Sequence, residues 1–300
     1  MILRDYRKKF SESLRHIYPS TEIDTFFFLL TENYLGLQRI DTSLRPDFQI
    51  NNKQLNTLNN ALKRLQKENP VQYIVGKTHF YGFPFLVNRQ VLIPRPETEE
   101  LVEWVIHEVE SGTSESQKAE SWKVESEKRT GKNMSVLDIG TGSGCIAITL
   151  KKHLPNAAVS AIDISKEAII TATKNAKLND VYIHFLVSDI LTTRELPEKY
   201  DIMISNPPYV RISEMEKMKN NVLQNEPHLA LFVANDNPLL FYDKIADLAI
   251  CHLSESGILY FEINQYLGKE IIELLKEKGF STIVLRKDIF GNDRMIKAIV

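Results

Sequence analysis

From residue 134 onward, short apolar runs alternate with stretches of helical periodicity, and this alternation constrains the fold more than any other feature. Helices are predicted at 144–153, 166–178, 238–253 and 268–278. The pattern predicts an α/β fold, in which helices cover both faces of a mostly parallel sheet. Such sheets bind ligands at the carboxyl ends of their strands. The predicted strands are 135–139, 158–163, 182–187, 200–205, 257–263, 281–286 and 295–300.

Residues 1–76 show helical periodicity instead and predict a small bundle that forms its own domain. Further helices are expected at 22–35, capped by Ser20 or Thr21, then from Asn51 or Asn52, and from Asn69-Pro70. The bundle carries no recognisable catalytic group, so packing and partner recognition both stay open as its role. The apolar face of its first helix consists of Leu3, Tyr6, Phe10, Leu14 and Ile17.

Residues 77–95 predict a hairpin that links the bundle to the alternating region. Phenylalanine and branched residues are interspersed with turn formers from 79 to 93, and acidic residues after Pro96 suit the first turn of a helix that reaches about His107. Residues 111–133 are rich in Ser, Glu, Lys and Gly, which predicts a polar surface insertion without chemistry. The expected domains are therefore 1–76 and 96–300, joined by the linker 77–95.

Composition excludes several classes of protein. The 300 residues are 43% hydrophobic and 25% charged, and a net charge of -2 argues against nucleic-acid binding through a basic surface. Two cysteines, Cys145 and Cys251, make no disulfide framework. No apolar run approaches the ~20 residues of a membrane span, and the N-terminus lacks the apolar core of a signal peptide. We expect a cytoplasmic protein that neither associates with a membrane nor binds nucleic acid directly.

The strand at 135–139 leads into a glycine-rich turn and then a helix. Its spacing is G-x-G-x-G, which differs from the dinucleotide fingerprint G-x-G-x-x-G. Asp138 would repel a pyrophosphate but suits a ligand that carries an ammonium group. S-adenosylmethionine (SAM) has an ammonium, a sulfonium and no phosphate, and therefore suits this turn. The alternative is a tight strand-to-helix turn that binds no ligand. The turn reads Asp138-Ile139-Gly140-Thr141-Gly142-Ser143-Gly144.

Acidic residues follow the next two strands. Asp163 lies about 20 residues beyond the glycines, where a carboxylate can accept hydrogen bonds from both hydroxyls of a ribose. An Asp at this place can also simply cap the next helix, and Ser165 competes for that role. Asp189 follows the third strand, where its side chain or backbone could contact an adenine. A simple turn residue is nearly as good an explanation of this aspartate.

The tetrapeptide Asn206-Pro207-Pro208-Tyr209 follows the strand at 200–205. Prolines cannot continue a ladder, so the chain leaves the sheet where an amide and an aromatic ring are presented. Amide and exocyclic amine nitrogens are poor nucleophiles, because their lone pair is delocalised. The side-chain oxygen of Asn206 and the carbonyl of Pro207 could hold both N–H groups, with Tyr209 stacked on the flat group. A Pro-Pro turn capped by Asn is the alternative without chemistry.

Other chemistries lack their residues. Neither cysteine follows a proline, which disfavours cytosine C5 methylation through a cysteine nucleophile. The seven histidines show no metal-ligand spacing, so no metal site is expected. The sequence also contains no G-x-S-x-G and no G-x-x-x-x-G-K-[ST] motif.

With these signals in order, the chain resembles a class I SAM-dependent methyltransferase of the N-methylating branch. It is more closely similar to the release-factor glutamine methyltransferases, the HemK-like or PrmC-type family. The resemblance covers roughly residues 55–300 and implies a seven-stranded Rossmann-like sheet, preceded by a small helical bundle and a hairpin. It is carried by 91–99 (VLIPRPETE), 70–76 (PVQYIVG) with Phe80-Tyr81-Gly82, and Glu226-Pro227 with Ala230-Leu231.

The resemblance implies methyl transfer from SAM to the side-chain amide of the glutamine in the Gly-Gly-Gln motif of peptide chain release factors, with S-adenosyl-L-homocysteine as product. The helical domain would help to dock the release factor, and a monomer is expected. The glutamine would be held by Asn206, Pro207, Pro208 and Tyr209. The expected cofactor-binding residues are Asp138, Gly140, Thr141, Gly142, Ser143, Gly144, Asp163, Asp189, Ile190 and Asn206.

Three departures from the family pattern stand beside this resemblance. Ile190 occupies a position that is often aromatic, residues 232–237 replace a glycine-rich stretch, and Asn264 stands where Glu-Ile is often followed by Gly. Other acceptors for the same chemistry are a ribosomal-protein glutamine and, less well matched, the N6 of DNA adenine. A non-catalytic SAM-binding protein is the alternative from a different class.

Overall fold

The structure is a computed structural model that describes residues 1–111, 134–218 and 220–300. Contacts divide it into two compact units, Met1–Lys77 with Met218–Asn225, and Thr78–Lys217 with Glu226–Val300. The insertion predicted at 111–133 lies outside the described residues except for Ser111, which ends a helix. The domain boundaries expected at 76 and 95 stay a prediction.

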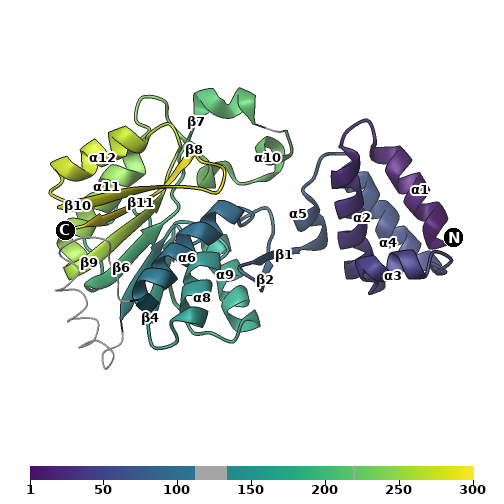
Figure 1. Cartoon of the computed structure of the whole chain (residues 1–300), viewed down its shortest axis with the longest axis horizontal. Helices are drawn as coiled ribbons and strands as arrows, with labels where there is room; N and C mark the ends of the chain where they lie inside the picture. Colours follow the sequence, from purple (N-terminus) through teal and green to yellow (C-terminus); the bar gives the residue numbers. More distant parts are fainter. Residues whose placement is uncertain (112–133, 219) are drawn as a thin grey trace. The chain divides into compact units, whose positions relative to one another are not determined.

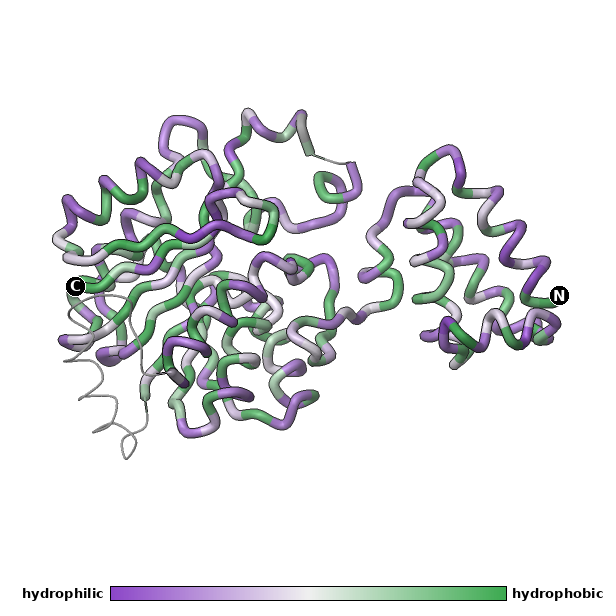
Figure 2. The backbone as a smooth tube through the Cα atoms, viewed as in Figure 1, coloured by the Kyte–Doolittle hydropathy of each residue, from purple (hydrophilic) through white to green (hydrophobic). Residues whose placement is uncertain are grey.

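The first unit is a helical bundle around one apolar core. Asn51 caps one helix, because its side chain accepts the N–H of Gln54 at 2.9 Å while the Gln54 side chain accepts the N–H of Asn51. Hydrophobic and hydrophilic segments alternate along each helix, as an amphipathic bundle requires (Figure 2). The helices are α1 (Leu3–Leu14), α2 (Ser20–Leu35), α3 (Arg39–Leu44), α4 (Asn52–Leu65), α5 (Val71–Val75) and α10 (Asn220–Asn225).

Several predicted boundaries in this unit were wrong. Helix α1 ends at Leu14, which leaves Ile17 off the buried face and 39% exposed. Pro19 and Pro70 occupy the N-cap positions of α2 and α5, in place of the Ser, Thr or Asn that we expected. Both prolines have the extended or near-extended ψ that such a position needs, and neither side chain provides a cap hydrogen bond. Helix α3 was not predicted, because it is only six residues long.

The second unit contains the predicted seven-stranded sheet, in the order β10-β11-β9-β6-β3-β4-β5. Strands β9, β6, β3, β4 and β5 are parallel, and β11 runs antiparallel to both of its neighbours. The strands are β3 (Ser135–Ile139), β4 (Ala158–Asp163), β5 (His184–Val187), β6 (Tyr200–Ser205), β9 (Leu253–Glu262), β10 (Thr282–Lys287) and β11 (Asp293–Ile299).

Helices cover both faces of this sheet (Figure 1). On one face lie α6 (Pro96–Ser111), α8 (Cys145–His153) and α9 (Lys166–Leu178), and on the other lie α11 (Leu240–His252) and α12 (Gly268–Glu277). Successive residues of one strand serve opposite cores, since Ile202 and Ile204 pack in the first and Met203 in the second. Burial on both faces explains why the strand sequences are almost continuously apolar.

The hairpin is shorter than predicted and consists of β1 (Lys77–Phe80) and β2 (Phe83–Leu86). Tyr81 and Gly82 both have positive φ, as a two-residue type I′ turn requires. Asn175 of α9 fixes β2, because its amide accepts the N–H of Leu86 at 2.6 Å and donates to the Leu86 carbonyl at 3.0 Å. Residues 87–95 carry no regular structure apart from turns and lead directly into α6.

The register of the parallel strands aligns their carboxyl ends. Ile139 pairs with Ile162 on one side and with Ser205 on the other, and Ser205 pairs with Phe261. The residues one step further along these four strands are therefore neighbours at one edge of the sheet. They are Gly140, Asp163, Asn206 and Glu262.

A buried ion pair joins α6 to the sheet. Lys297 and Glu108 are 1% and 4% exposed, and the Nζ of Lys297 lies 2.6 Å from Oε1 of Glu108. The indole N–H of Trp104 and the hydroxyl of Tyr260 donate to the same carboxylate at 2.8 and 2.7 Å. The charge of Glu108 is thus fully coordinated inside the apolar layer.

Within the described ranges, no helix is long and apolar enough to cross a membrane. The same residues hold no group of three or more His, Cys, Asp or Glu side chains arranged to bind a metal ion.

Removing one partner of the buried Lys297–Glu108 pair should destabilise the folded protein. We expect Lys297→Met to lower the free energy of unfolding by about 3 kcal/mol or more, because Glu108 would stay buried without its cation. Lys287→Met removes a lysine whose side chain is 63% exposed in its pair with Asp293, and should cost about 0–1 kcal/mol. Urea unfolding of both variants measures the difference. Equal losses for the two variants would contradict the importance of the buried pair.

Candidate active site

A cavity of about 300 Å³ lies at the carboxyl edge of the sheet, where the aligned strand ends meet. Its lining residues include two aspartates but neither lysine nor arginine. This charge pattern suits a ligand with a positive group and disfavours a phosphate. Its lining residues are Gln90–Leu92, Ile139, Gly140, Gly142, Ile162–Ser165, Ala168, Ser188–Leu191, Ser205–Pro208, Pro227, Leu229, Ala230, Phe241 and Ile245.

The glycine turn forms one wall of this cavity. Gly140 and Gly142 have φ of 77° and 55°, in the left-handed region where a side chain is strained. The N–H groups of Gly140 and Thr141 both donate to the carbonyl of Ile162, at 2.9 and 3.0 Å, which holds the turn against β4. A Cβ at either glycine would meet no protein atom within 4 Å. The space beside their backbone is thus left for a ligand.

Asp138 does not line the cavity. It is fully buried behind the turn, where its Oδ2 accepts from the hydroxyl of Thr141 at 2.6 Å and from the N–H of Ala147 at 3.2 Å. Its Oδ1 has no hydrogen-bond partner among the described residues. Burial raises the pKa of Asp138 to about 7, against the lowering effect of these two hydrogen bonds. Asp138 thus supports the turn from inside, and the backbone of the turn makes the cavity wall.

Asp163 ends β4 and faces the cavity. One of its oxygens accepts the N–H of Gly142 and the other the N–H of Ser165, both at 2.8 Å. Ser165, and not Asp163, caps α9, since its hydroxyl accepts the N–H of Ala168 at 3.1 Å. Each oxygen of Asp163 keeps a second lone pair for a hydroxyl of a ligand. Burial raises the pKa of Asp163 despite these backbone hydrogen bonds.

The remaining predicted cofactor residues divide into two groups. Asp189 and Ile190 line the cavity after β5, and Ile190 supplies an apolar surface there. Thr141, Ser143 and Gly144 belong to the turn but are not part of the cavity lining. A Cβ on Gly144 would approach the side chains of Ile148 and Ala172 at 3.0 and 3.1 Å, so this glycine is needed for the packing of α8 on α9.

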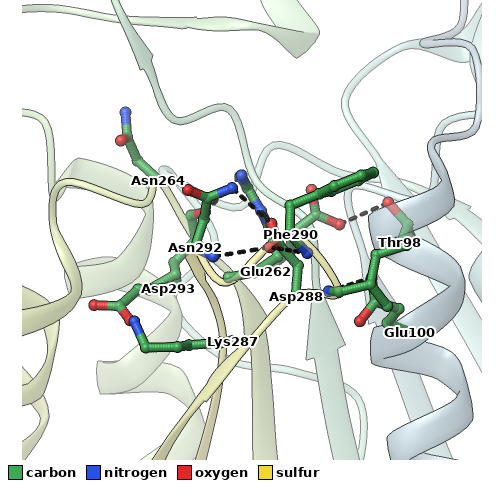
Figure 3. A network of polar contacts seen from close by, with 12 residues as sticks. Thr98, Glu100, Glu262, Asn264, Lys287, Asp288, Phe290, Asn292 and Asp293 are labelled. Atoms are coloured by element: carbon green, nitrogen blue, oxygen red, sulfur yellow. Dashed lines mark hydrogen bonds and ion pairs between the residues drawn. The ribbon is translucent and has the colours of Figure 1, made fainter.

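Asn206 directly follows β6, which flanks β3 on the side away from β4. It lines the cavity together with Pro207 and Pro208. Its Nδ2 donates to the hydroxyl of Thr98 in the first turn of α6 at 3.2 Å. The Thr98 hydroxyl donates in turn to Oε2 of Glu262 at 2.6 Å (Figure 3). The amide of Asn206 is therefore held by Thr98 and, through Thr98, by Glu262, neither of which was predicted as a site residue.

Tyr209 is not brought to the cavity lining. Its hydroxyl donates to Oε1 of Glu262 at 3.0 Å, and its ring packs partly buried against the core on the α11 and α12 side. Burial and the neighbouring Glu262 raise its pKa far above that of an ordinary tyrosine. Stacking of this ring on a substrate group stays a prediction.

Sequence reasoning missed Thr98 and Glu262. A signal for Glu262 existed, because it ends an apolar strand in the same way as Asp163 does, at the edge where ligands bind. Thr98 lies in the stretch 91–99 that carries the family resemblance, but no role followed for it, since a threonine in the first turn of a helix is an ordinary residue.

Another buried carboxylate joins two segments that line the cavity. Glu226, 4% exposed, pairs with Arg95 at 2.6 Å and accepts the N–H of Ile93 at 3.3 Å. These contacts join the segment after the hairpin to the one that contains η2 (His228–Ala230), and both supply lining residues. The second segment is also tied down by β8 (Phe232–Val233), which pairs with β7 (Val210–Arg211) just before η1 (Ile212–Lys217).

The raised pKa of Asp138 predicts a pH-dependent stability. Between pH 4 and 7 the folded protein keeps a proton on Asp138 that the unfolded chain releases, because the pKa is about 7 when folded and near 3.8 otherwise. The free energy of unfolding should fall as the pH rises through this window, and Asp138→Asn should remove that part of the decline. Melting temperatures of both proteins at pH 5 and pH 8, without ligand, measure the effect. If the melting temperatures of the wild type and Asp138→Asn differ by the same amount at pH 5 and at pH 8, the prediction is wrong.

Comparison with a solved structure agrees with the fold. The hMettl16 catalytic domain, crystallised with the MAT2A 3′UTR hairpin 6, superposes with a TM-score of 0.52. It covers 73% of this chain and 75% of that one at 17% identity, so the likeness shows a class I methyltransferase fold and nothing more.

Sequence comparisons are more specific. The family profile of the PrmC N-terminal domain matches residues 5–76, and that of the methyltransferase small domain matches residues 124–233. A release factor glutamine methyltransferase of Flavobacterium psychrophilum is 50% identical over 297 residues, which is 99% of each chain. One from Bacteroides thetaiotaomicron is 40% identical over 96% of each chain. This chain belongs to the release factor glutamine methyltransferase family, a family of class I SAM-dependent methyltransferases.

Proposed function

We propose that this enzyme methylates the side-chain amide nitrogen of the glutamine in the Gly-Gly-Gln motif of peptide chain release factors. The observation that carries the proposal is the amide of Asn206, which lines the cavity of about 300 Å³ while its Nδ2 is already bonded to Thr98. Its Oδ1 stays available to accept an N–H group from a second amide.

The cavity fits SAM on three grounds: it has no basic lining residue, two glycines with open space beside them, and Asp163 with spare acceptor capacity. Asp163 would hold the ribose hydroxyls, Asp189 and Ile190 would border the adenine, and the backbone of Gly140 and Gly142 would border the methionine part. Asp138 would act indirectly, by holding the turn through Thr141 and Ala147. When bound, SAM supplies an electrophilic methyl group on a sulfonium.

The residues of the tetrapeptide would prepare the acceptor nitrogen. Oδ1 of Asn206 and the carbonyl of Pro207 would accept the two N–H groups of the glutamine amide, which turns the nitrogen lone pair away from them. As the nitrogen gains the methyl group it becomes more positive, and these two acceptors stabilise that charge. The nitrogen would then release one proton to water, which gives the neutral N-methyl amide. Pro208 would fix the direction of the preceding carbonyl, and Tyr209 would flank the substrate.

The enzyme would act as a monomer, as the family resemblance implies. The helical segment 1–76 would dock the body of the release factor, the hairpin region 77–95 would link it, and 96–300 would carry the chemistry. A substrate that works in translation places the enzyme in the cytoplasm.

Methyl transfer from labelled SAM tests the acceptor. We expect label on a release factor that carries Gly-Gly-Gln, none when that glutamine is changed to alanine, and at least a 100-fold loss of rate in Asn206→Ala. Ribosomal protein and DNA serve as parallel substrates. Label on either of these with none on the release factor would replace the proposal by the corresponding alternative.

Affinity for SAM tests the ribose contact separately. Asp163→Asn should weaken SAM binding about 10- to 100-fold, because hydrogen bonds to a charged acceptor are lost. Asp236→Asn, at an exposed position outside the cavity, is the matched control and should bind like the wild type. Isothermal titration calorimetry measures both constants. Equal affinities in the two variants would exclude Asp163 from the cofactor site.

A further inference from the structure

We propose that Thr98 and Glu262 are positioning residues that fix the orientation of the Asn206 amide, so that its oxygen and not its NH2 group faces the substrate. The inference rests on the proposed function, in which that oxygen accepts an N–H of the glutamine. An asparagine whose amide turned over by 180° would present two donors to another donor, and the substrate amide would be repelled.

The argument begins with the single proton of the Thr98 hydroxyl. A hydroxyl donates one hydrogen bond and accepts up to two. At 2.6 Å from Oε2 of Glu262, the Thr98 proton is engaged by that carboxylate. Towards Asn206, at 3.2 Å, the Thr98 oxygen can then only accept. The atom of Asn206 that faces Thr98 must therefore be the nitrogen, which leaves Oδ1 on the cavity side.

Glu262 can play this part because both of its oxygens meet donors. Oε2 accepts from Thr98, and Oε1 accepts from the hydroxyl of Tyr209 at 3.0 Å. The residue is 1% exposed, so water does not compete for these positions. The carboxylate behaves as a fixed acceptor that orders the protons of two hydroxyls around it.

The place of Glu262 is itself fixed from several elements. Its backbone carbonyl accepts from the hydroxyl of Tyr242 in α11 at 3.2 Å. Next to it, the carbonyl of Ile263 accepts from Nη1 of Arg294 in β11 at 3.3 Å. Arg294 is held by Asp288, 3.1 Å from its Nε, and Asp288 also accepts the N–H groups of Phe290 and Asn292 (Figure 3). The end of β9 cannot shift without disturbing this network.

The chain of contacts connects residues that are far apart in the sequence, since Thr98 and Glu262 are 164 positions apart and Thr98 and Asn206 are 108 apart. Neither Thr98 nor Glu262 lines the cavity. Their effect on the reaction therefore passes through Asn206, which distinguishes them from residues that touch substrate or cofactor.

Substitution at Thr98 tests the inference. Thr98→Val keeps the shape but removes the hydroxyl, and should lower kcat about 10- to 100-fold through misorientation of Asn206. The Kd for SAM should stay within about twofold, because Thr98 is outside the cavity. Thr98→Ser restores the hydroxyl and should recover kcat to within about threefold of the wild type. Glu262→Gln, which replaces the obligatory acceptor by an amide that can also donate, should lower kcat in the same manner.

Thr149→Val is the matched control. Thr149 is fully buried in α8, and its hydroxyl has no hydrogen-bond partner among the described residues, so the same change should leave kcat within about twofold. A Thr98→Val enzyme with wild-type kcat would overturn the inference. So would a Thr98→Ser enzyme as slow as Thr98→Val, because the methyl group and not the hydroxyl would then matter.

A second measurement needs no substrate. In ¹⁵N spectra, the side-chain NH2 signals of Asn206 should shift in Thr98→Val and return in Thr98→Ser, because one proton loses and regains its acceptor. Unchanged signals in Thr98→Val would refute the contact even if the enzyme were active. Failure of the proposed function would appear differently, as absence of methyl transfer by the wild type with this spectral pattern preserved.

Discussion

The parallel register of four strands is the constraint on which the rest of this site depends. Because Ile139, Ile162, Ser205 and Phe261 lie side by side, the next residue of each strand reaches the same edge of the sheet. One of those residues begins the glycine turn, one is the acid that faces the cavity, one is Asn206 and one is Glu262. A slip of one residue in any pairing would send the corresponding side chain to the opposite face.

Buried carboxylates then hold the loops that leave this edge. Asp138 accepts a hydrogen bond from the glycine turn, and Glu226 joins the segment after the hairpin to the segment around η2. Glu262 accepts hydrogen bonds from Thr98 and Tyr209. Loops are ordinarily the mobile part of a fold, and a buried acid with several donors around it makes each of them rigid. The cost is desolvation, which raises the pKa of both Asp138 and Glu262. A site built in this way has its acceptors in position before any ligand arrives.

The sequence alone was sufficient for the sheet, because alternating apolar runs identify strands that are buried on both faces. It also located the glycine turn, Asp163 and Asn206 at strand ends, where they line the cavity. It could not show that Asp138 lies buried behind the glycine turn, since the side chain of a strand residue can point to either face of a sheet. It could not find the partner of Asn206 either, because Thr98 reaches it only after α6 has packed on the sheet. The predicted hairpin was too long. The predicted caps of α2 and α5 were wrong because a proline occupies each N-cap position.

The arrangement also explains why an asparagine at this position needs a partner that fixes the orientation of its side-chain amide. Its two ends are almost equal in shape and opposite in hydrogen bonding, so shape alone cannot select the productive orientation. A carboxylate in place of the amide would always present an acceptor, but it would add a charge close to Glu262 and could not donate to Thr98. The amide therefore needs an external element that distinguishes oxygen from nitrogen, and the single proton of a threonine, committed to a buried glutamate, is sufficient to make that distinction.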